Sequence, residues 1–265
     1  MGDVLNHRIK CKKAYMTLVY SILIFILGSL LASFFQLVAL RVPNKESISG
    51  RSYCLQCHQQ LRWIDILPIF GYLVNLGQCH NCKQPIPISH LIIEILGGAL
   101  FVSAYLMIGF ELELIVAFIM ISVLLIESIS DGAYMIVIDR IWIIGIVPLI
   151  AIRIIQGSFL EYGLSSLVLF GILYLFAFIG KKMYHREAFG GGDVKIYLFI
   201  GFCLTYQLGI LSLFLASLFG LIFGLIRRQK ANAEIALIPF IFAGVWISYF
   251  YGTMFMNWYL NLLGA

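Results

Sequence analysis

Two aspartates that lie beside apolar segments could together carry acid–base chemistry. Asp131 ends one long apolar segment, and Asp193 stands just before another. Two carboxyl groups a few ångström apart cannot both ionise easily, so they share one proton. One carboxylate can then deprotonate a water while the other carboxyl protonates the scissile carbonyl or the leaving amine. The pair therefore predicts aspartyl-protease chemistry in which the two groups titrate as a unit.

Three consecutive glycines precede Asp193: Gly190, Gly191 and Gly192. Because glycine has no Cβ, such a backbone can turn sharply and approach a peptide substrate closely. The alternative is a flexible loop in which Asp193 caps a helix that begins at Val194. A lone Asp131 has a similar alternative, as the polar end of a helix.

Three further acidic residues border or interrupt apolar segments: Glu94, Glu127 and Asp139. Ionisable residues in such segments are costly and mark candidate functional sites. Glu127 lies four residues before Asp131 on the same helical face, so it is a rival for the second carboxylate. Asp139 is either part of the site or simply solvated. Glu94 is expected to pair with a basic residue near the membrane surface.

Four of the six cysteines form two C-x-x-C pairs with 21 residues between them: Cys54 and Cys57, and Cys79 and Cys82. This spacing is typical of zinc ribbons, in which two knuckles give four thiolates to one ion. Such a site has no open position, so the metal would be structural. The alternatives are two disulfides, which a reducing cytoplasmic loop disfavours, or four unrelated thiols. His58 and His80 stand beside the knuckles as alternative ligands.

The composition indicates a membrane protein. Of the 265 residues, 62% are hydrophobic and 12% are charged, whereas soluble domains have roughly 45–50% apolar and about 25% charged residues. A soluble enzyme and a disordered protein are therefore excluded. The net charge of +5 is attributed to basic cytoplasmic loops. No polar segment interleaves basic and aromatic residues, so the expected partner is the lipid bilayer and no nucleic acid is expected.

The apolar runs predict an all-α, polytopic helical bundle with about eight spans and a cytoplasmic zinc-ribbon-like loop. A span needs about 20 apolar residues. The charge-free run 196–226 would be about 46 Å long as one helix, so we expect it to break near residues 205–209. The expected spans are residues 15–40, 91–110, 114–126, 141–152, 162–180, the two parts of 196–226, and 235–265.

Basic residues set the expected orientation, since cytoplasmic loops carry more lysine and arginine. With the cysteine loop in the cytoplasm, Asp131 and Asp193 fall on the cytoplasmic side. So do Lys181, Lys182, Arg186, Lys195, Arg227, Arg228 and Lys230. The basic residues at 8–13 fit this scheme only if the first segment does not cross simply, and both arrangements of the tail stay open.

At this point the chain resembles the type IV prepilin leader peptidases, the A24 aspartyl peptidases, which include the late-competence processing peptidases. The shared features are the double C-x-x-C loop after the first span, two aspartates eight residues apart, and a G-x-G-D-x-K motif before a later span. The last motif maps onto Gly190, Gly191, Gly192, Asp193 and Lys195. The resemblance covers roughly residues 28–225.

Shorter matches and departures lie around these motifs. Residues 32–43 resemble a first-span motif of the family, with Ala32 for the usual glycine and Gln36 for the usual asparagine. Ile138 stands where the family commonly has proline before the second aspartate, Asp139. The cysteine loop also fits the family at Arg51, Ser52, Trp63, Asp65, Pro68 and Pro85, and Glu94 fits just after it.

The resemblance implies a bifunctional enzyme of a prokaryotic inner or plasma membrane. It would cleave type IV prepilin or pseudopilin-like substrates after a glycine, removing a basic leader, and N-methylate the new terminus. Asp131 and Asp193 would be catalytic, supported by the glycines, Lys195 and Asp139. S-adenosylmethionine would be the methyl donor, in a region that includes Arg41 and Glu94.

The expected organisation has three parts. Residues 1–40 form the tail and first span, residues 41–90 the metal-binding loop, and residues 91–265 the peptidase domain. The first two parts together would form the methyltransferase region. Two other functions compete with the peptidase: a proton-coupled transporter that uses the same acids as a relay, and a membrane scaffold whose zinc loop binds a partner.

Overall fold

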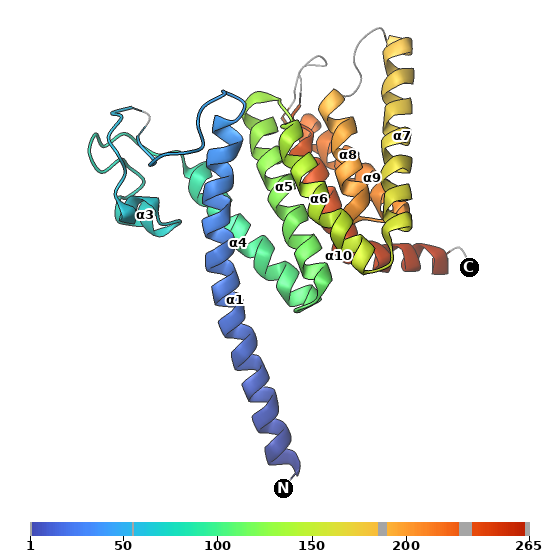
Figure 1. Cartoon of the computed structure of the whole chain (residues 1–265), viewed down its shortest axis with the longest axis horizontal. Coiled ribbons are helices and arrows are strands. Elements are labelled where there is room, and N and C mark those ends of the chain that lie inside the picture. The colour runs from blue at the N-terminus through green and yellow to red at the C-terminus, as the bar shows by residue number, and fades with distance from the viewer. Residues whose placement is uncertain (1, 55, 185–189, 228–234, 263–265) are drawn as a thin grey trace. The chain divides into compact units, whose positions relative to one another are not determined.

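The described part of the chain folds into ten helices (Figure 1). This computed structural model describes residues 2–54, 56–184, 190–227 and 235–262, with side chains from residue 14 onward except that of residue 184. Within those ranges the only β-pairing consists of two isolated bridges, so the predicted all-α class is confirmed. Contacts group the chain into two units, Met1–Arg41 with Lys45–Leu114, and Val42–Asn44 with Ile115–Ala265.

The first unit pairs two long helices and carries two short ones: α1 (Gly2–Arg41), α2 (Trp63–Ile66), α3 (Phe70–Val74) and α4 (Ile88–Ile108). Helices α1 and α4 are in close contact. Glycines allow it, because a Cβ added at Gly28 would lie 2.9 Å from the Cβ of Phe101. In lipid, such close approach gains the van der Waals contact that drives helix association.

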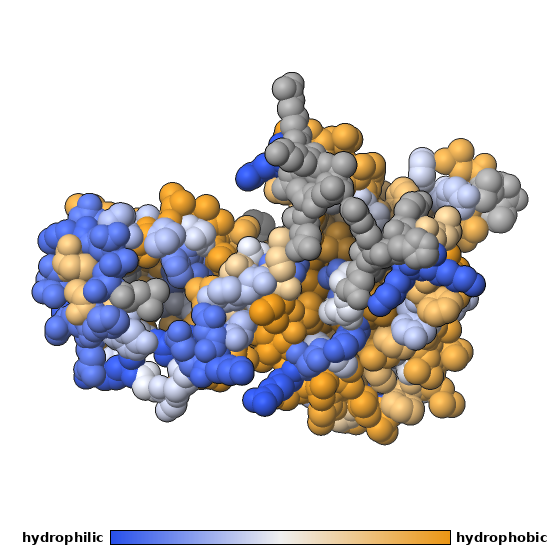
Figure 2. All heavy atoms as spheres, turned by 90° about the horizontal axis from the view of Figure 1, so that it is seen from above, coloured by the Kyte–Doolittle hydropathy of each residue, from blue (hydrophilic) through white to orange (hydrophobic). Residues whose placement is uncertain are grey.

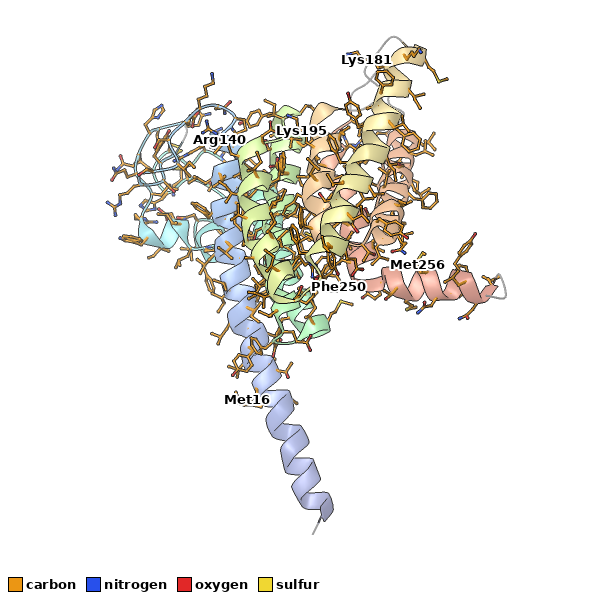
Figure 3. All side chains as sticks on the ribbon, turned by 45° about the vertical axis from the view of Figure 1, so that its right-hand side comes forward. Met16, Arg140, Lys181, Lys195, Phe250 and Met256 are labelled. Atoms are coloured by element: carbon orange, nitrogen blue, oxygen red, sulfur yellow. The ribbon has the colours of Figure 1, made fainter. Side chains whose placement is uncertain are left out.

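The second unit is built from six helices: α5 (Leu112–Tyr134), α6 (Asp139–Ile155), α7 (Phe159–Tyr184), α8 (Gly191–Cys203), α9 (Tyr206–Ile226) and α10 (Ile238–Leu262). Helix α8 supplies much of its core, since Ile196, Tyr197 and Phe199 are fully buried. It packs against α6 and α7, while α9 pairs with α10. Figure 3 shows α10 bending near Phe250, so that the part with Met256 runs away from the bundle.

Six of the described helices are long and apolar enough to cross a membrane: α1 from Ala14, α4, α5, α7 to Met183, α9 and α10. The chain is therefore a multi-pass membrane protein, and hydrophobic atoms form much of the surface that is visible around its helices (Figure 2). All eight predicted apolar segments form helices, but α6 and α8 have only 17 and 13 residues. The expected count of eight spans is thus not confirmed. The predicted break in 196–226 is confirmed, between Cys203 and Tyr206.

A buried arginine explains why α8 can end so early. Arg153, in the last turn of α6, is 1% exposed. Its guanidinium donates to the carbonyls of Phe202 and Cys203 at 3.0 and 3.2 Å and lies 3.6 Å from the ring centroid of Tyr162. A cation here satisfies carbonyls that a helix end leaves without partners and complements the helix dipole. It therefore fixes the end of α8 opposite to Asp193.

Candidate active site and metal centre

The candidate acids of the second unit gather where α5 ends and where α6, α8 and α10 begin. Asp131 lies in the last turn of α5 and is 6% exposed. Its Oδ2 accepts a hydrogen bond of 2.9 Å from the backbone N–H of Ile238, the first residue of α10. N–H groups in the first turn of a helix lack intrahelical partners and favour negative charge. The start of α10 therefore holds the Asp131 carboxyl in place.

Asp193 is in the first turn of α8 and is partly exposed. Its backbone N–H donates to the carbonyl of Gly190 at 3.1 Å, as expected where a helix begins. Burial, and after it the charge of Asp131, raises the pKa of the Asp193 carboxyl to about 7. The fold thus brings two acids from distant parts of the sequence to the same end of one unit.

The three glycines before Asp193 have different surroundings. A Cβ at Gly192 would collide with the side chain of Val137, in the segment between α5 and α6. A Cβ at Gly190 would lie 2.9 Å from Oδ2 of Asp193, whereas one at Gly191 would meet no atom within 4 Å. Gly192 is therefore required for packing, a reason that the sequence analysis did not foresee.

Asp139 and Lys195 form an ion pair of 2.9 Å between the first turns of α6 and α8. The indole N–H of Trp142 also donates to Asp139, at 3.2 Å. The Lys195 ammonium lowers the pKa of Asp139 below its usual range, although burial opposes this. Because both side chains are about half exposed, we read the pair as a surface tie between α6 and α8.

Glu127 lies one turn before Asp131 and is fully buried. Its Oε2 accepts a hydrogen bond of 2.8 Å from the backbone N–H of Ile138. Its Oε1 has no hydrogen-bond partner among the described residues. Nearby, the hydroxyl of Ser130 donates to the carbonyl of Ile136 at 2.7 Å. A serine in an apolar helix carries no distinctive sequence signal, so Ser130 could not be singled out from the sequence.

The four paired cysteines of the first unit converge on one point. Their sulfur atoms all lie within 4.8 Å of one another, with 3.8 Å between Cys54 and Cys82 and 4.0 Å between Cys57 and Cys79. Four sulfurs at tetrahedral positions about 2.3 Å from a zinc ion would be about 3.8 Å apart. The cluster therefore fits a tetrahedral metal, and neither neighbouring histidine belongs to it.

Each C-x-x-C pair lies in a small knuckle closed by an isolated bridge, Tyr53 with Gln60 and Gln78 with Pro85. The residues after the second cysteines, His58 and Lys83, both have positive φ, near 54° and 59°. The backbone N–H groups of Cys57 and Gln56 lower the pKa of the Cys54 thiol to about 6. The knuckle backbone thus favours the thiolate that binds metal.

The two residues assigned to the methyltransferase region hold parts of the first unit together. Glu94 accepts hydrogen bonds from the Ser33 hydroxyl and from the Ile69 N–H, both at 2.8 Å, and so ties α1 and the residue before α3 to α4. Arg41 donates to the carbonyl of Ser47 at 3.2 Å and lies 5.3 Å from the ring centroid of Tyr53. Glu94 therefore pairs with a hydroxyl and an N–H rather than with the basic residue that we expected.

Two family models match the chain. The Bacterial Peptidase A24 N-terminal domain matches residues 26–108, which contain α4 and the cysteine cluster. The Type IV leader peptidase family matches residues 118–225, which contain Asp131, Glu127, Asp139 and Asp193. No solved structure gave a significant match.

Curated relatives agree with these matches. A prepilin leader peptidase/N-methyltransferase of Bacillus subtilis is 30% identical over 91% of this chain and 98% of its own length. Relatives with the same description from Myxococcus xanthus and Legionella pneumophila are 28% and 26% identical, over 78% and 80% of this chain and 63% and 76% of their own lengths. The comparisons support neither a transporter nor a scaffold.

Proposed function

Because the chain belongs to the type IV leader peptidase family, we propose that it is a membrane aspartyl endopeptidase. It removes the leader of type IV prepilin-like proteins and methylates the new N-terminus. The observation that carries this proposal is the placement of Asp131 and Asp193, from α5 and α8, at one end of the second unit. The division into residues 1–40, 41–90 and 91–265 stays a prediction.

The surroundings of the two aspartates indicate which of them acts as the base and which as the acid. Asp131 accepts the N–H of Ile238, and a hydrogen bond to a carboxylate favours its charged form. We therefore assign Asp131 to take the proton of the attacking water. Asp193, the more exposed of the two, protonates the scissile carbonyl oxygen. Asp131 then gives the proton taken from water to the leaving amine, and Asp193 recovers its proton from the hydroxyl as the carbonyl re-forms, so the pair again shares one proton.

The charges around the acids favour a cytoplasmic location for this end of the unit. Among the described residues, this end carries Arg140, Lys181, Lys182, Lys195 and Arg227. Lys181, Arg140 and Lys195 lie toward the same end in Figure 3. Arg186, Arg228 and Lys230, which were expected there as well, lie outside the described residues. By the positive-inside rule we place the site at the inner face of a prokaryotic inner or plasma membrane, within reach of a cytoplasmic leader.

The four cysteines are proposed to hold a structural zinc ion. Four thiolates leave no open position, so their role is to fold residues 54–82. S-adenosylmethionine, when bound, would supply the methyl group. Both Glu94 oxygens already accept hydrogen bonds inside the protein, so Glu94 is given a structural role. Neither Glu94 nor Arg41 is assigned a contact with the methyl donor.

The test is cleavage of a prepilin-like peptide with a basic leader and a Gly-Phe junction by the purified, reconstituted protein. Wild type should release the leader, and mass spectrometry should show a methyl group on the new terminus when S-adenosylmethionine is added. Asp131→Asn and Asp193→Asn, if folded and metal-loaded, should not cleave. Full cleavage by either variant would show that the two aspartates do not form a catalytic dyad.

A further inference from the structure

The segment between the two knuckles exposes large apolar side chains outside the six candidate spans. Trp63 is 76% exposed, Phe70 68% and Leu76 86%. Five other exposed apolar side chains belong to the same stretch: Ile64, Ile66, Leu67, Leu73 and Val74. Figure 2 shows hydrophobic atoms among the mostly hydrophilic atoms of the cysteine loop. An exposed apolar set of this kind marks an interaction surface.

Helices α2 and α3 form one rigid hairpin. The Asp65 carboxylate accepts hydrogen bonds from Arg62 at 2.9 Å and from Asn75 at 2.8 Å. A Cβ at Gly71 would collide with the Asp65 carbonyl, so the two short helices are packed backbone to backbone. The apolar side chains are therefore presented outward by a fixed scaffold, which we call the α2–α3 hairpin (residues 62–76).

The attachment of this hairpin places it beside a membrane helix. The N–H of Ile69 donates to Glu94 at 2.8 Å, and Glu94 lies six residues after the start of α4, about 9 Å along the axis. The same carboxylate binds Ser33, eight residues before the end of α1, about 12 Å along its axis. Because α1 and α4 are both candidate spans, the hairpin is held below their ends, at the depth of the bilayer interface.

We propose that the α2–α3 hairpin is an interfacial membrane anchor whose partner is an anionic lipid surface. Apolar side chains on a short helical element, with basic residues beside them, are typical of segments that lie in the headgroup region. Arg51 lies 5.5 Å from the ring centroid of Trp63, and tryptophan is enriched at that depth. Residues 41–90 hold five lysines and arginines against two acids, which complements anionic headgroups.

The test measures the fluorescence of Trp63 in the full-length protein with Trp142, Trp246 and Trp258 replaced by phenylalanine. The protein is placed in nanodiscs of phosphatidylcholine and phosphatidylglycerol whose acyl chains are brominated either near the headgroup or near the chain end. We expect blue-shifted emission that shallow bromines quench strongly and deep bromines weakly. The matched control carries Trp63→Phe and Gln59→Trp, which moves the probe to an exposed knuckle residue of the same loop.

The control should emit as in water and stay unquenched, with both proteins binding the same amount of zinc. Water-like, unquenched emission from Trp63 would overturn the proposal and would favour a soluble protein as the partner. Strong quenching of both probes would also overturn it, because the whole loop rather than the hairpin would then lie in the lipid.

A separate observation in the second unit concerns Glu127. Two side chains of α5 form hydrogen bonds with the backbone of the connector between α5 and α6, residues 135–138. Ser130 donates to the carbonyl of Ile136, and Glu127 accepts the N–H of Ile138. The connector leaves α5 through Met135, which has a left-handed φ of 55°. Its path therefore depends on these side-chain hydrogen bonds rather than on regular structure.

The connector in turn contacts the start of α8. Val137, which lies between the two hydrogen-bonded residues, packs so tightly against Gly192 that a Cβ there would collide with it. Gly192 directly precedes Asp193. A displacement of the connector would thus shift the backbone that carries Asp193, while Asp131 would remain anchored by α10.

We infer that Glu127 is a positioning residue for Asp193 and not the second carboxyl of the dyad. This inference rests on the proposed function. What Glu127 supplies is a hydrogen-bond acceptor for Ile138, and neither its charge nor its proton is needed. Proline at 138 would have no N–H to offer and would fix φ near −65°, not far from the −91° of Ile138. A proline connector would therefore not need the acceptor.

The test compares cleavage kinetics and thermal unfolding of Glu127→Gln, Glu127→Leu and the double variant Glu127→Leu/Ile138→Pro. Glutamine keeps an acceptor, so kcat should stay near that of wild type with an unchanged pH profile. Leucine should lower kcat by about 100-fold, the scale of a 1 Å misplacement, with little change in KM. The double variant should recover much of that loss.

Loss of activity in Glu127→Gln together with an altered pH profile would show that the proton of Glu127 takes part in the chemistry, and would overturn the inference. Full activity in Glu127→Leu, or no recovery in the double variant, would also overturn it. Failure of the dyad itself is seen separately, as activity in Asp131→Asn or Asp193→Asn.

Discussion

The two units place their reactive groups in opposite ways. In the first unit, four sulfur atoms come from residues 54–82 and are set by two local knuckles. In the second, the acids come from α5 and α8, and contacts with α10, α6 and the segment before α6 fix the helix ends that carry them. A site set by local turns is disrupted by removing its ligands or its metal. A site set by helix packing is disrupted by small changes in volume far from any ligand.

The largest effect on activity is expected from adding one methyl group at the start of α8. Gly192→Ala puts a Cβ into the side chain of Val137, so kcat should fall by about 100-fold while the zinc content stays constant. Gly191→Ala, one residue away with open space around it, should cost much less. Equal losses in the two variants would show that backbone flexibility, rather than packing, is what the glycines provide.

Removal of the metal should unfold the cysteine loop of the first unit and leave the second unit folded. Binding energy of structural zinc is folding energy, of the order of 10 kcal/mol or more. A strong chelator should therefore abolish hydrogen-exchange protection across residues 54–82 while α5 to α10 stay protected. The Cys54→Ser/Cys82→Ser variant should behave in the same way without chelator. Loss of protection throughout both units would contradict independent construction of the two sites.

Loss of the hydrogen bonds of Asp65 should have a smaller effect, on the local stability of the α2–α3 hairpin, and this effect should depend on pH. Arg62 lowers the pKa of Asp65 to about 2, below its usual value of about 3.9. The stabilisation is therefore complete above about pH 4 and is lost as the pH falls toward 2. Asp65→Asn should lower the local stability of the hairpin by roughly 1–3 kcal/mol near neutral pH. In hydrogen exchange, the difference from wild type should shrink as the pH falls, and a constant difference would refute the assignment.

The smallest effect is expected at the Asp139–Lys195 ion pair. Both side chains are about half exposed, and exposed pairs contribute about 0–1 kcal/mol. Lys195→Gln should lower the melting temperature only slightly, and less so at high salt. A loss of cleavage as large as that of Gly192→Ala would show that the pair contacts the substrate instead of tying α6 to α8.

Local features of the sequence predicted more of the first unit than of the second. The C-x-x-C spacing predicts the metal cluster because each knuckle is a turn of a few residues. The apolar runs predict the helices and the break before Tyr206, since length and hydropathy decide them. The hairpin at 62–76 was not foreseen, because its two helices have only 4 and 5 residues.

Several contacts in the second unit could not be predicted from the sequence. The burial of Arg153 depends on where the carbonyls of α8 end, and no local pattern specifies that. The hydrogen bond from Ile138 to Glu127 joins residues 11 positions apart, across a connector with no regular structure. The types of the candidate acids could be read from the sequence, but their surroundings depend on contacts between distant helices.

The most direct test of the central claim, that Asp131 and Asp193 act as one dyad, is a comparison of cleavage rates in single and double variants. Residues that act as a unit give strongly non-additive effects. We predict that Asp131→Asn, Asp193→Asn and the double variant all fall to the same residual rate, with folding and zinc content unchanged. A double variant whose rate loss equals the product of the two single losses would contradict the claim, as would a single variant with the wild-type rate.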